Sequence, residues 1–137
     1  MVDGMAEEDT PVRVILVDDE PDLRILLWLA IEADGRCQVV GDASNGVEGV
    51  SLAASAEPDV VVLDQLMPEM DGITAVPLLR QAAPGAKIIM LSALADPVAR
   101  DRAMDAGADA YVEKSASFQP LLDLAVALAR GNAANRN

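Results

Sequence analysis

The feature that most constrains the fold is a regular alternation of short apolar runs, rich in Val, Ile and Leu, with longer segments whose apolar residues recur at helical spacing. The apolar runs, which predict strands, cover residues 12–17, 37–40, 59–64, 87–91 and 110–112. The helical segments cover residues 21–34, 47–56, 74–83, 97–106 and 120–130. Strands that alternate with helices form a parallel sheet, because each crossover returns right-handed across it. We therefore predict an α/β doubly wound fold, (βα)5, with a five-stranded parallel sheet and helices on both faces.

The chain is short enough to form one domain, and no long linker divides it. Its 137 residues are expected to comprise a flexible acidic segment (1–11), a folded domain (12–130) and a polar tail (131–137). The acidic start lacks the positive charge and apolar run of a signal peptide. No apolar stretch approaches the ~20 residues that span a bilayer. We therefore expect a cytoplasmic protein that does not contact a membrane.

Three helices carry details that a structure can test. Pro77 would remove a backbone hydrogen bond from a helix interior, so we expect its helix to begin close to Thr74, with Pro77 near the first turn. In the first helix, Trp28 lies off the apolar stripe and is expected to be partly exposed. The residues at helical intervals there are Leu23, Leu26, Leu27, Ala30 and Ile31. In the last helix the residues expected in the core are Leu121, Leu122, Ala125 and Leu128.

Composition excludes several kinds of site. The chain has no histidine, which rules out Ser-His-Asp and Cys-His catalysis, histidine-ligated zinc and a role as a phosphohistidine carrier. Its 23 acidic and 10 basic side chains give a formal net charge of −13. Because such a surface repels phosphate, this segment is not expected to bind nucleic acid or an anionic membrane directly. Cys37, the single cysteine, is expected to be a small packing residue.

Polar and charged residues follow the predicted strands at their carboxyl ends. Asp18 and Asp19 follow the first strand, and Asp64 ends the third. Ser92 follows the fourth strand and Lys114 the fifth. Ligands of an open parallel sheet bind outside these ends, so we expect the five side chains to meet in one crevice. Three nearby carboxylates repel one another, and Mg²⁺, which prefers oxygen ligands, would stabilise them.

The same crevice suits phosphoryl transfer. The ammonium of Lys114 beside metal-held carboxylates can bind a tetrahedral dianion, and Ser92 can donate its hydroxyl to a phosphoryl oxygen. Since the chain offers no histidine, the expected nucleophile is a carboxylate, which would form an acyl phosphate.

The order of these motifs resembles the receiver domain of bacterial two-component response regulators. The segments that carry the resemblance are VILVDDEP, VVVLDQLMPEMDG, IIMLSA and GADAYVEKS, and it covers residues 12–130. It implies the flavodoxin-like strand order 2-1-3-4-5. It also implies a signalling domain that promotes its own phosphorylation and is not an enzyme acting on other substrates.

The resemblance gives each strand-end residue a role. Asp64 is implied as the phosphoacceptor, which takes a phosphoryl group from the phosphohistidine of a sensor histidine kinase or phosphotransfer protein. The implied Mg²⁺ ligands are Asp18, Asp19, Asp64 and the backbone carbonyl of Leu66. Lys114 is implied as the partner of the phosphoryl group.

A switch is implied as well. Ser92 would move toward the phosphoryl group, and Tyr111, three residues before Lys114, would change rotamer in response. The surface of the fourth helix, fifth strand and fifth helix would then signal to a downstream protein or output domain. A second copy of the chain is a further candidate partner. Leu66 and Leu94 occupy positions that control water access in this family, and because both are apolar we expect slow autodephosphorylation.

Three alternatives use the same fold elements. A phosphatase of the haloacid dehalogenase type also has a strand-end Asp, but it requires a second acid where this chain has Leu66. A flavodoxin-like flavin carrier shares the topology, but Asp18, Asp19 and Glu20 would repel the flavin phosphate. The third is a non-phosphorylated pseudo-receiver that serves only as an interaction module, and the presence of all five site residues argues against it.

Overall fold

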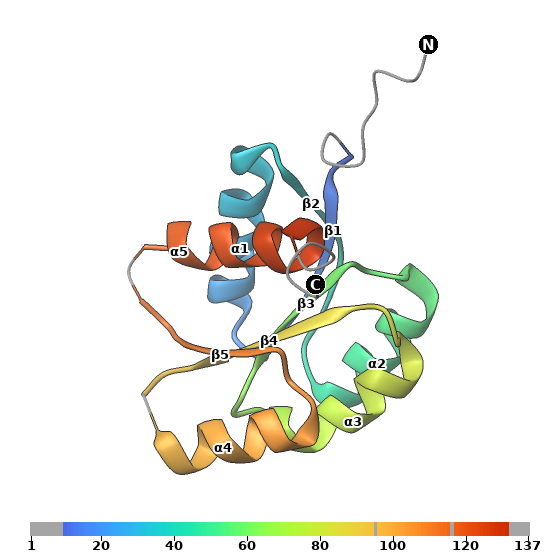
Figure 1. Cartoon of the computed structure of the whole chain (residues 1–137), viewed down its shortest axis with the longest axis vertical. Coiled ribbons are helices and arrows are strands. Elements are labelled where there is room, and N and C mark those ends of the chain that lie inside the picture. The colour runs from blue at the N-terminus through green and yellow to red at the C-terminus, as the bar shows by residue number, and fades with distance from the viewer. Residues whose placement is uncertain (1–9, 95, 116, 132–137) are drawn as a thin grey trace.

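A five-stranded parallel sheet in the order β2-β1-β3-β4-β5 lies at the centre of the protein (Figure 1). The computed structural model describes residues 10–94, 96–115 and 117–131. The strands are β1 (Val12–Val17), β2 (Cys37–Ala43), β3 (Val60–Asp64), β4 (Lys87–Ser92) and β5 (Ala110–Glu113). The helices are α1 (Pro21–Asp34), α2 (Gly46–Ala56), α3 (Gly72–Ala82), α4 (Pro97–Ala106) and α5 (Gln119–Val126). The predicted fold and strand order are confirmed.

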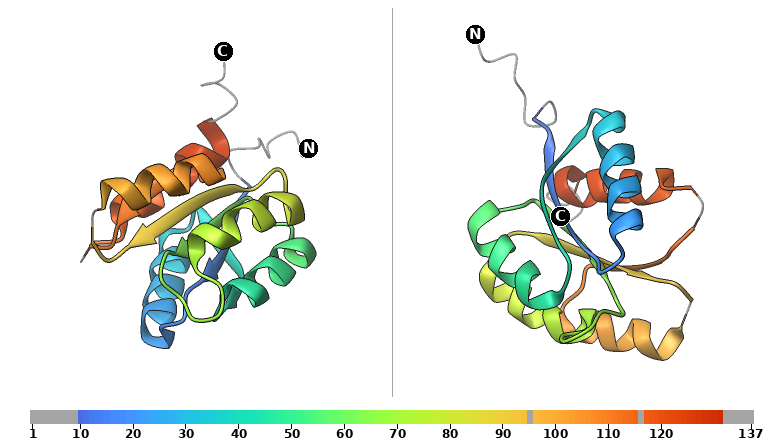
Figure 2. Two further views of the ribbon diagram at one scale, coloured as in Figure 1. Left: turned by 90° about the horizontal axis from the view of Figure 1, so that it is seen from below. Right: turned by 180° about the vertical axis from the view of Figure 1, so that it is seen from behind.

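Helices cover both faces of the sheet, α1 and α5 on one and α2, α3 and α4 on the other (Figures 1 and 2). The strands divide their side chains between the two layers because successive residues point to opposite faces. In β1, Val14 and Leu16 pack against α1 and α5, whereas Ile15 and Val17 pack against the other three helices. Each face therefore has its own apolar core, and the central strands are buried on both sides.

Parts of the predicted domain scheme fall outside the described residues. Residues 1–9 of the expected acidic segment and 132–137 of the expected tail are not described. Within the described part of the chain, no helix has the length and apolar character needed to cross a membrane.

The beginning of α3 differs from the prediction. The helix starts at Gly72, not near Thr74, because Asp71 caps it by accepting a hydrogen bond from the Thr74 backbone N–H at 2.8 Å. Pro77 consequently lies inside the helix and not in its first turn. The Asp71 cap specifies the start of the helix, and the loss of one backbone hydrogen bond at an exposed proline is tolerated.

Two other element ends differ from the prediction by more than one residue. The α-helical part of α5 ends at Val126 and continues as a π-helical turn over Ala127–Gly131, so the α-helix expected to reach Arg130 is shorter. β2 extends beyond Val40 to Ala43, because its pairing with β1 continues after a register shift.

The first helix buries a narrower stripe than its helical intervals suggest. Leu27 and Ile31 are fully buried, but Leu26 is 54% exposed. Trp28 is half-buried against the core between α1 and α5, as expected for a residue off the stripe. The last helix buries Leu121 and its neighbours Leu122 and Ala125, and Leu128 packs against them while half-buried.

A close backbone contact fixes the end of β3 against α3. The Gly72 N–H donates to the carbonyl of Gln65 at 2.7 Å. A Cβ atom at Gly72 would overlap the carbonyl oxygen of Asp64 and lie 3.0 Å from the Gln65 Cα. Only a residue without a side chain therefore allows α3 to start at this distance from β3.

This contact leads to a first prediction. Gly72→Ala should lower the free energy of unfolding by about 1–3 kcal/mol, because the added methyl group must displace backbone atoms. Gly85→Ala is the matched control, since a Cβ at Gly85 meets no atom within 4 Å. Urea unfolding of the parent and both variants measures the difference. Equal stability of the two variants would contradict the close approach at Gly72.

Candidate functional site

Three carboxylates meet at the carboxyl edge of the sheet. Asp18 and Asp19 follow β1, and Asp64 is the last residue of the neighbouring strand β3. An oxygen atom from each of the three lies within 4.8 Å of the others. Asp18 and Asp64 are buried, with Asp64 only 5% exposed. Parallel pairing of adjacent strands accounts for the convergence, because it places their carboxyl ends side by side.

Lys114, immediately after β5, supplies the positive charge of the cluster. Its Nζ lies 3.0 Å from Asp64 Oδ1 and 3.7 Å from Asp18 Oδ2. The Lys114 backbone N–H donates to the Ser92 carbonyl at 2.7 Å, which holds the residue at the end of β4. The ammonium therefore faces two acids delivered by two different strands.

Two further residues that follow β1 support this cluster, although neither was among the predicted site residues. Glu20 places Oε1 3.5 Å from Lys114 Nζ and is exposed. Arg24, in the first turns of α1, donates from Nη1 to the Asp18 carbonyl at 2.6 Å and pairs through Nε with Asp42 at 3.0 Å. The guanidinium thus fixes the backbone of Asp18, while Glu20 shares the charge of the ammonium. The position of Glu20 in the acidic run 18–20 could have indicated that it lies at the site, whereas no sequence pattern indicates this for Arg24.

Burial dominates the electrostatics of the acids. The pKa of Asp64 is raised to about 6, and burial is the largest cause. The charges of Asp18 and Asp19 also raise it, whereas the hydrogen bond with Lys114 opposes the rise. Burial likewise raises the pKa of Asp18, which the backbone N–H of Glu20 and the charge of Lys114 partly offset. Burial would lower the pKa of Lys114, but its hydrogen bond with Asp64 and the surrounding acids outweigh that effect and raise it.

The donor set fits a divalent cation. Asp18 Oδ1 accepts the backbone N–H of Glu20 at 2.8 Å, but the buried Asp18 Oδ2 has no hydrogen-bond partner among the described residues. A buried carboxylate oxygen without a donor, close to two more carboxylates, is the arrangement that a hard oxygen-seeking cation stabilises. That the backbone carbonyl of Leu66 is a further ligand stays a prediction.

Ser92 lies at the end of β4 but its hydroxyl is turned toward its own loop. Ser92 Oγ donates to the Leu94 carbonyl at 2.6 Å and accepts the Leu94 N–H at 3.3 Å. The residue is buried beside the carboxyl edge of the sheet. The structure therefore holds the hydroxyl in a local turn and forms no described bond from it to Asp64.

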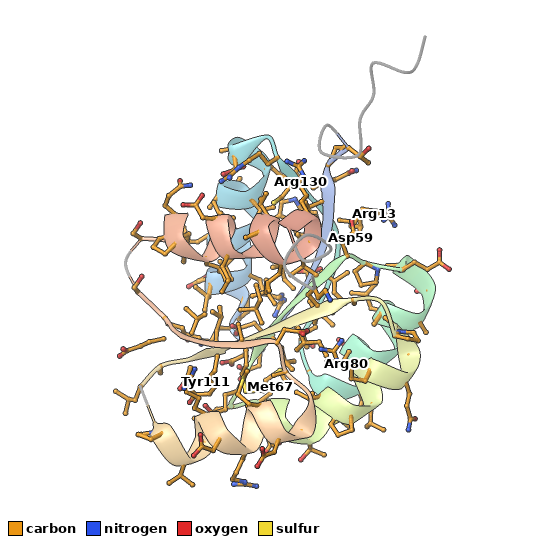
Figure 3. All side chains as sticks on the ribbon, viewed as in Figure 1. Arg13, Asp59, Met67, Arg80, Tyr111 and Arg130 are labelled. Carbon is orange, nitrogen blue, oxygen red and sulfur yellow. The ribbon has the colours of Figure 1, made fainter. Side chains whose placement is uncertain are left out.

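Tyr111 in β5 faces the core on the side of α3 and α4 (Figure 3). Its hydroxyl donates to Gln65 Oε1 at 2.7 Å. Sequence reasoning missed Gln65, which directly follows Asp64. Side-chain direction in an irregular loop follows no sequence period, so only the structure places these two side chains together.

Exposed apolar side chains occupy the two loops nearest the carboxylates. Leu66 in the loop after β3 is 69% exposed, and Leu94 in the loop after β4 is 75% exposed. They carry no group that could bind or orient a water molecule.

Comparison with known proteins agrees with this fold. The family of response regulator receiver domains matches residues 14–126. The response regulator protein VraR of Staphylococcus aureus is 31% identical over 120 residues, which are 88% of this chain and 57% of VraR. The chain thus spans a little over half the length of the curated relatives it matches.

Solved structures show the same similarity. The signal receiver domain of the response regulator NarL from Mycobacterium tuberculosis superimposes with a TM-score of 0.83 at 29% identity, covering 88% of this chain and 98% of that one. A complex of CheX and CheY with BeF3 and magnesium from Borrelia burgdorferi gives a TM-score of 0.75 at 26% identity, covering 87% and 88%.

The doubly wound sheet with clustered strand-end acids gives this chain the flavodoxin-like topology. This chain belongs to the response regulator receiver domain family of two-component systems. Receiver domains bind Mg²⁺ at an acidic pocket, and here the aspartate cluster lies at the corresponding edge of the sheet.

The raised pKa of Asp64 gives a second prediction. The carboxyl titrates at 3.8 when unfolded and at about 6 when folded, so between these values the folded state holds more protons and stability falls as pH rises. In metal-free buffer near neutral pH, Asp64→Asn should therefore raise the free energy of unfolding by as much as about 3 kcal/mol. The gain should disappear below about pH 3, where the Asp64 carboxyl is protonated in both the folded and the unfolded protein.

Urea unfolding over a pH series measures this effect. Asp105→Asn removes the same charge from an exposed position of α4 and serves as the control. A gain from Asp64→Asn that persists unchanged at low pH would show that burial of the charge is not its cause.

Proposed function

We propose that this domain accepts a phosphoryl group on Asp64 from the phosphohistidine of a sensor histidine kinase or phosphotransfer protein, in a Mg²⁺-dependent reaction. The observation that carries the proposal is the position of Lys114 Nζ, 3.0 Å from a buried Asp64 that also adjoins Asp18 and Asp19. Such a set combines a nucleophilic oxygen, a cation-binding group and a positive charge for the transferred phosphoryl group.

The proposed transfer exchanges one bond to phosphorus for another. A carboxylate oxygen of Asp64 attacks the phosphorus, and a P–O bond forms while the P–N bond of the donor breaks. The electron pair of the P–N bond stays on the imidazole, which leaves neutral when its other ring nitrogen already carries a proton. The attacking oxygen must be ionised, and the pKa of about 6 at Asp64 leaves it mostly so at neutral pH.

Each charged neighbour of Asp64 has a part in this reaction. Asp18, Asp19 and Asp64 would hold Mg²⁺, with the Leu66 carbonyl as an added ligand. When bound, Mg²⁺ supplies a positive charge that offsets the repulsion between the carboxylates and the incoming phosphoryl oxygens. Lys114, which pairs with Asp64 in this structure, would pair with the phosphoryl group after its transfer to Asp64.

The response would begin at Ser92. A phosphoryl group adds nearly two negative charges, which attract the Ser92 hydroxyl away from Leu94. Tyr111 would then change rotamer, and the surface formed by α4, β5 and α5 would change with it. That surface would signal to a downstream protein or to an output domain. A second copy of the chain remains a candidate partner, and the cytoplasm is the proposed location.

Direct phosphorylation tests the function. Incubation with acetyl phosphate and Mg²⁺ should add the mass of one phosphoryl group to the protein, detected by intact-mass spectrometry. Asp64→Asn and chelation of the metal should each abolish the gain, while Asp105→Asn should keep it. If the parent protein gains no mass under these conditions, the chain acts as a non-phosphorylated interaction module and the proposal is wrong.

The lifetime of the acyl phosphate gives a further prediction. Because Leu66 and Leu94 offer no group that orients an attacking water, the phosphorylated domain should lose its phosphoryl group over minutes or longer. Replacing Leu66 by Asn should shorten the half-life several-fold, whereas Leu29→Asn, at an exposed position of α1, should leave it unchanged. A parent half-life of seconds would contradict the role given to the apolar side chains.

A further inference from the structure

The backbone of Gln65 is fixed on two sides. Its N–H donates to the Leu91 carbonyl of β4 at 2.9 Å, and its carbonyl accepts the Gly72 N–H of α3 at 2.7 Å. The residue is half-buried and directly follows Asp64. Because its backbone is held on both sides, the Gln65 side chain can fix the position of a neighbouring residue.

Gln65 uses its side chain to hold Tyr111. The Tyr111 hydroxyl donates to Gln65 Oε1 at 2.7 Å, and the ring packs against the core that includes Met67 on the side of α4 (Figure 3). A half-buried tyrosine hydroxyl requires a hydrogen-bond partner, because burial without one is unfavourable. A rotamer of Tyr111 that leaves Gln65 therefore gives up this bond, and water can satisfy the hydroxyl there.

The hydroxyls of Ser92 and Tyr111 are both bonded to protein groups in this structure. Ser92 Oγ is bonded to Leu94 on its own loop, and Tyr111 is bonded to the residue next to Asp64. Both bonds occur in a conformation in which the Ser92 hydroxyl is turned toward its own loop and not toward Asp64, and both are lost if the two side chains move. Each bond consequently adds to the free energy that separates this conformation from the switched one.

We infer that Gln65 is a positioning residue that holds Tyr111 in its resting rotamer and so sets the equilibrium between the resting and switched conformations. The inference rests on the proposed function, since it presumes that occupation of the Asp64 site favours the switched state. Gln65 would thus regulate the conformational equilibrium, which neither the acid cluster nor Lys114 does. Gln65 acts through Tyr111 and does not touch the transferred group.

The single tyrosine of the chain provides a direct probe. Incorporation of 3-fluorotyrosine gives one ¹⁹F resonance from position 111. Gln65→Met, which keeps the side-chain length but removes the acceptor, should shift this resonance toward its position in the parent protein with Mg²⁺ and beryllofluoride, an analogue of the phosphoryl group. Gln81→Met, at an exposed position of α3, makes the same chemical change elsewhere and should leave the resonance in place.

The affinity for beryllofluoride in the presence of Mg²⁺ measures the equilibrium itself. Because a net hydrogen bond is lost from the resting state alone, Gln65→Met should bind the analogue about fivefold more tightly than the parent. Tyr111→Phe should tighten binding in the parent background but have no further effect in the Gln65→Met background. That dependence separates a hydrogen bond between the two residues from a general loosening of the loop.

The outcomes distinguish the two proposals. Parent protein that binds no beryllofluoride refutes the proposed function, and the role of Gln65 falls with it. Parent protein that binds, with Gln65→Met unchanged or weaker in affinity, refutes the role of Gln65 alone. The same conclusion holds if Tyr111→Phe has equal effects in both backgrounds, because the two side chains are then not coupled.

Discussion

The rest of the structure depends on the repulsion between carboxylates that two strands bring to one edge of the sheet. Asp18 and Asp64 are buried there with Asp19 beside them, and the ammonium of Lys114 offsets only part of their charge. Burial, with a smaller contribution from the neighbouring acids, raises the pKa of both Asp18 and Asp64. A bound cation would stabilise this excess of negative charge. The binding of Mg²⁺ is therefore coupled to the charge state of Asp64, the residue proposed to react.

The fold holds these charges in place through backbone contacts around them. Arg24 anchors the Asp18 carbonyl, and the Gly72 N–H anchors the loop after Asp64. The Lys114 N–H is bonded to the end of β4. Because these contacts involve main-chain atoms, the acids cannot relax apart without disrupting strand ends. Preorganisation of this kind keeps the like charges of the carboxylates together. The side chains of Ser92 and Tyr111 are then the parts proposed to move.

Strand direction could be predicted from the sequence, whereas side-chain direction in the loops could not. Buried parallel strands are recognisable from their branched apolar residues, and their shared edge brings Asp64 and Lys114 together. The start of α3 was misplaced because the Asp71 cap outweighed the constraint expected from Pro77. The partnership of Gln65 with Tyr111 could not be predicted, since it joins two side chains distant in sequence through an irregular loop.

The side chain of Arg80 holds one end of α4 in place. Arg80 of α3 donates to the Gly107 carbonyl after α4 and to the Ala86 carbonyl before β4, and it pairs with Asp109 (Figure 3). The C-terminal end of α4 is therefore tied to α3 and to the sheet. The N-terminal end instead comes after the loop in which Ser92 is bonded to Leu94. In the proposed switch, rearrangement of that loop would move the start of α4, while its end stays tied to α3 and to the sheet.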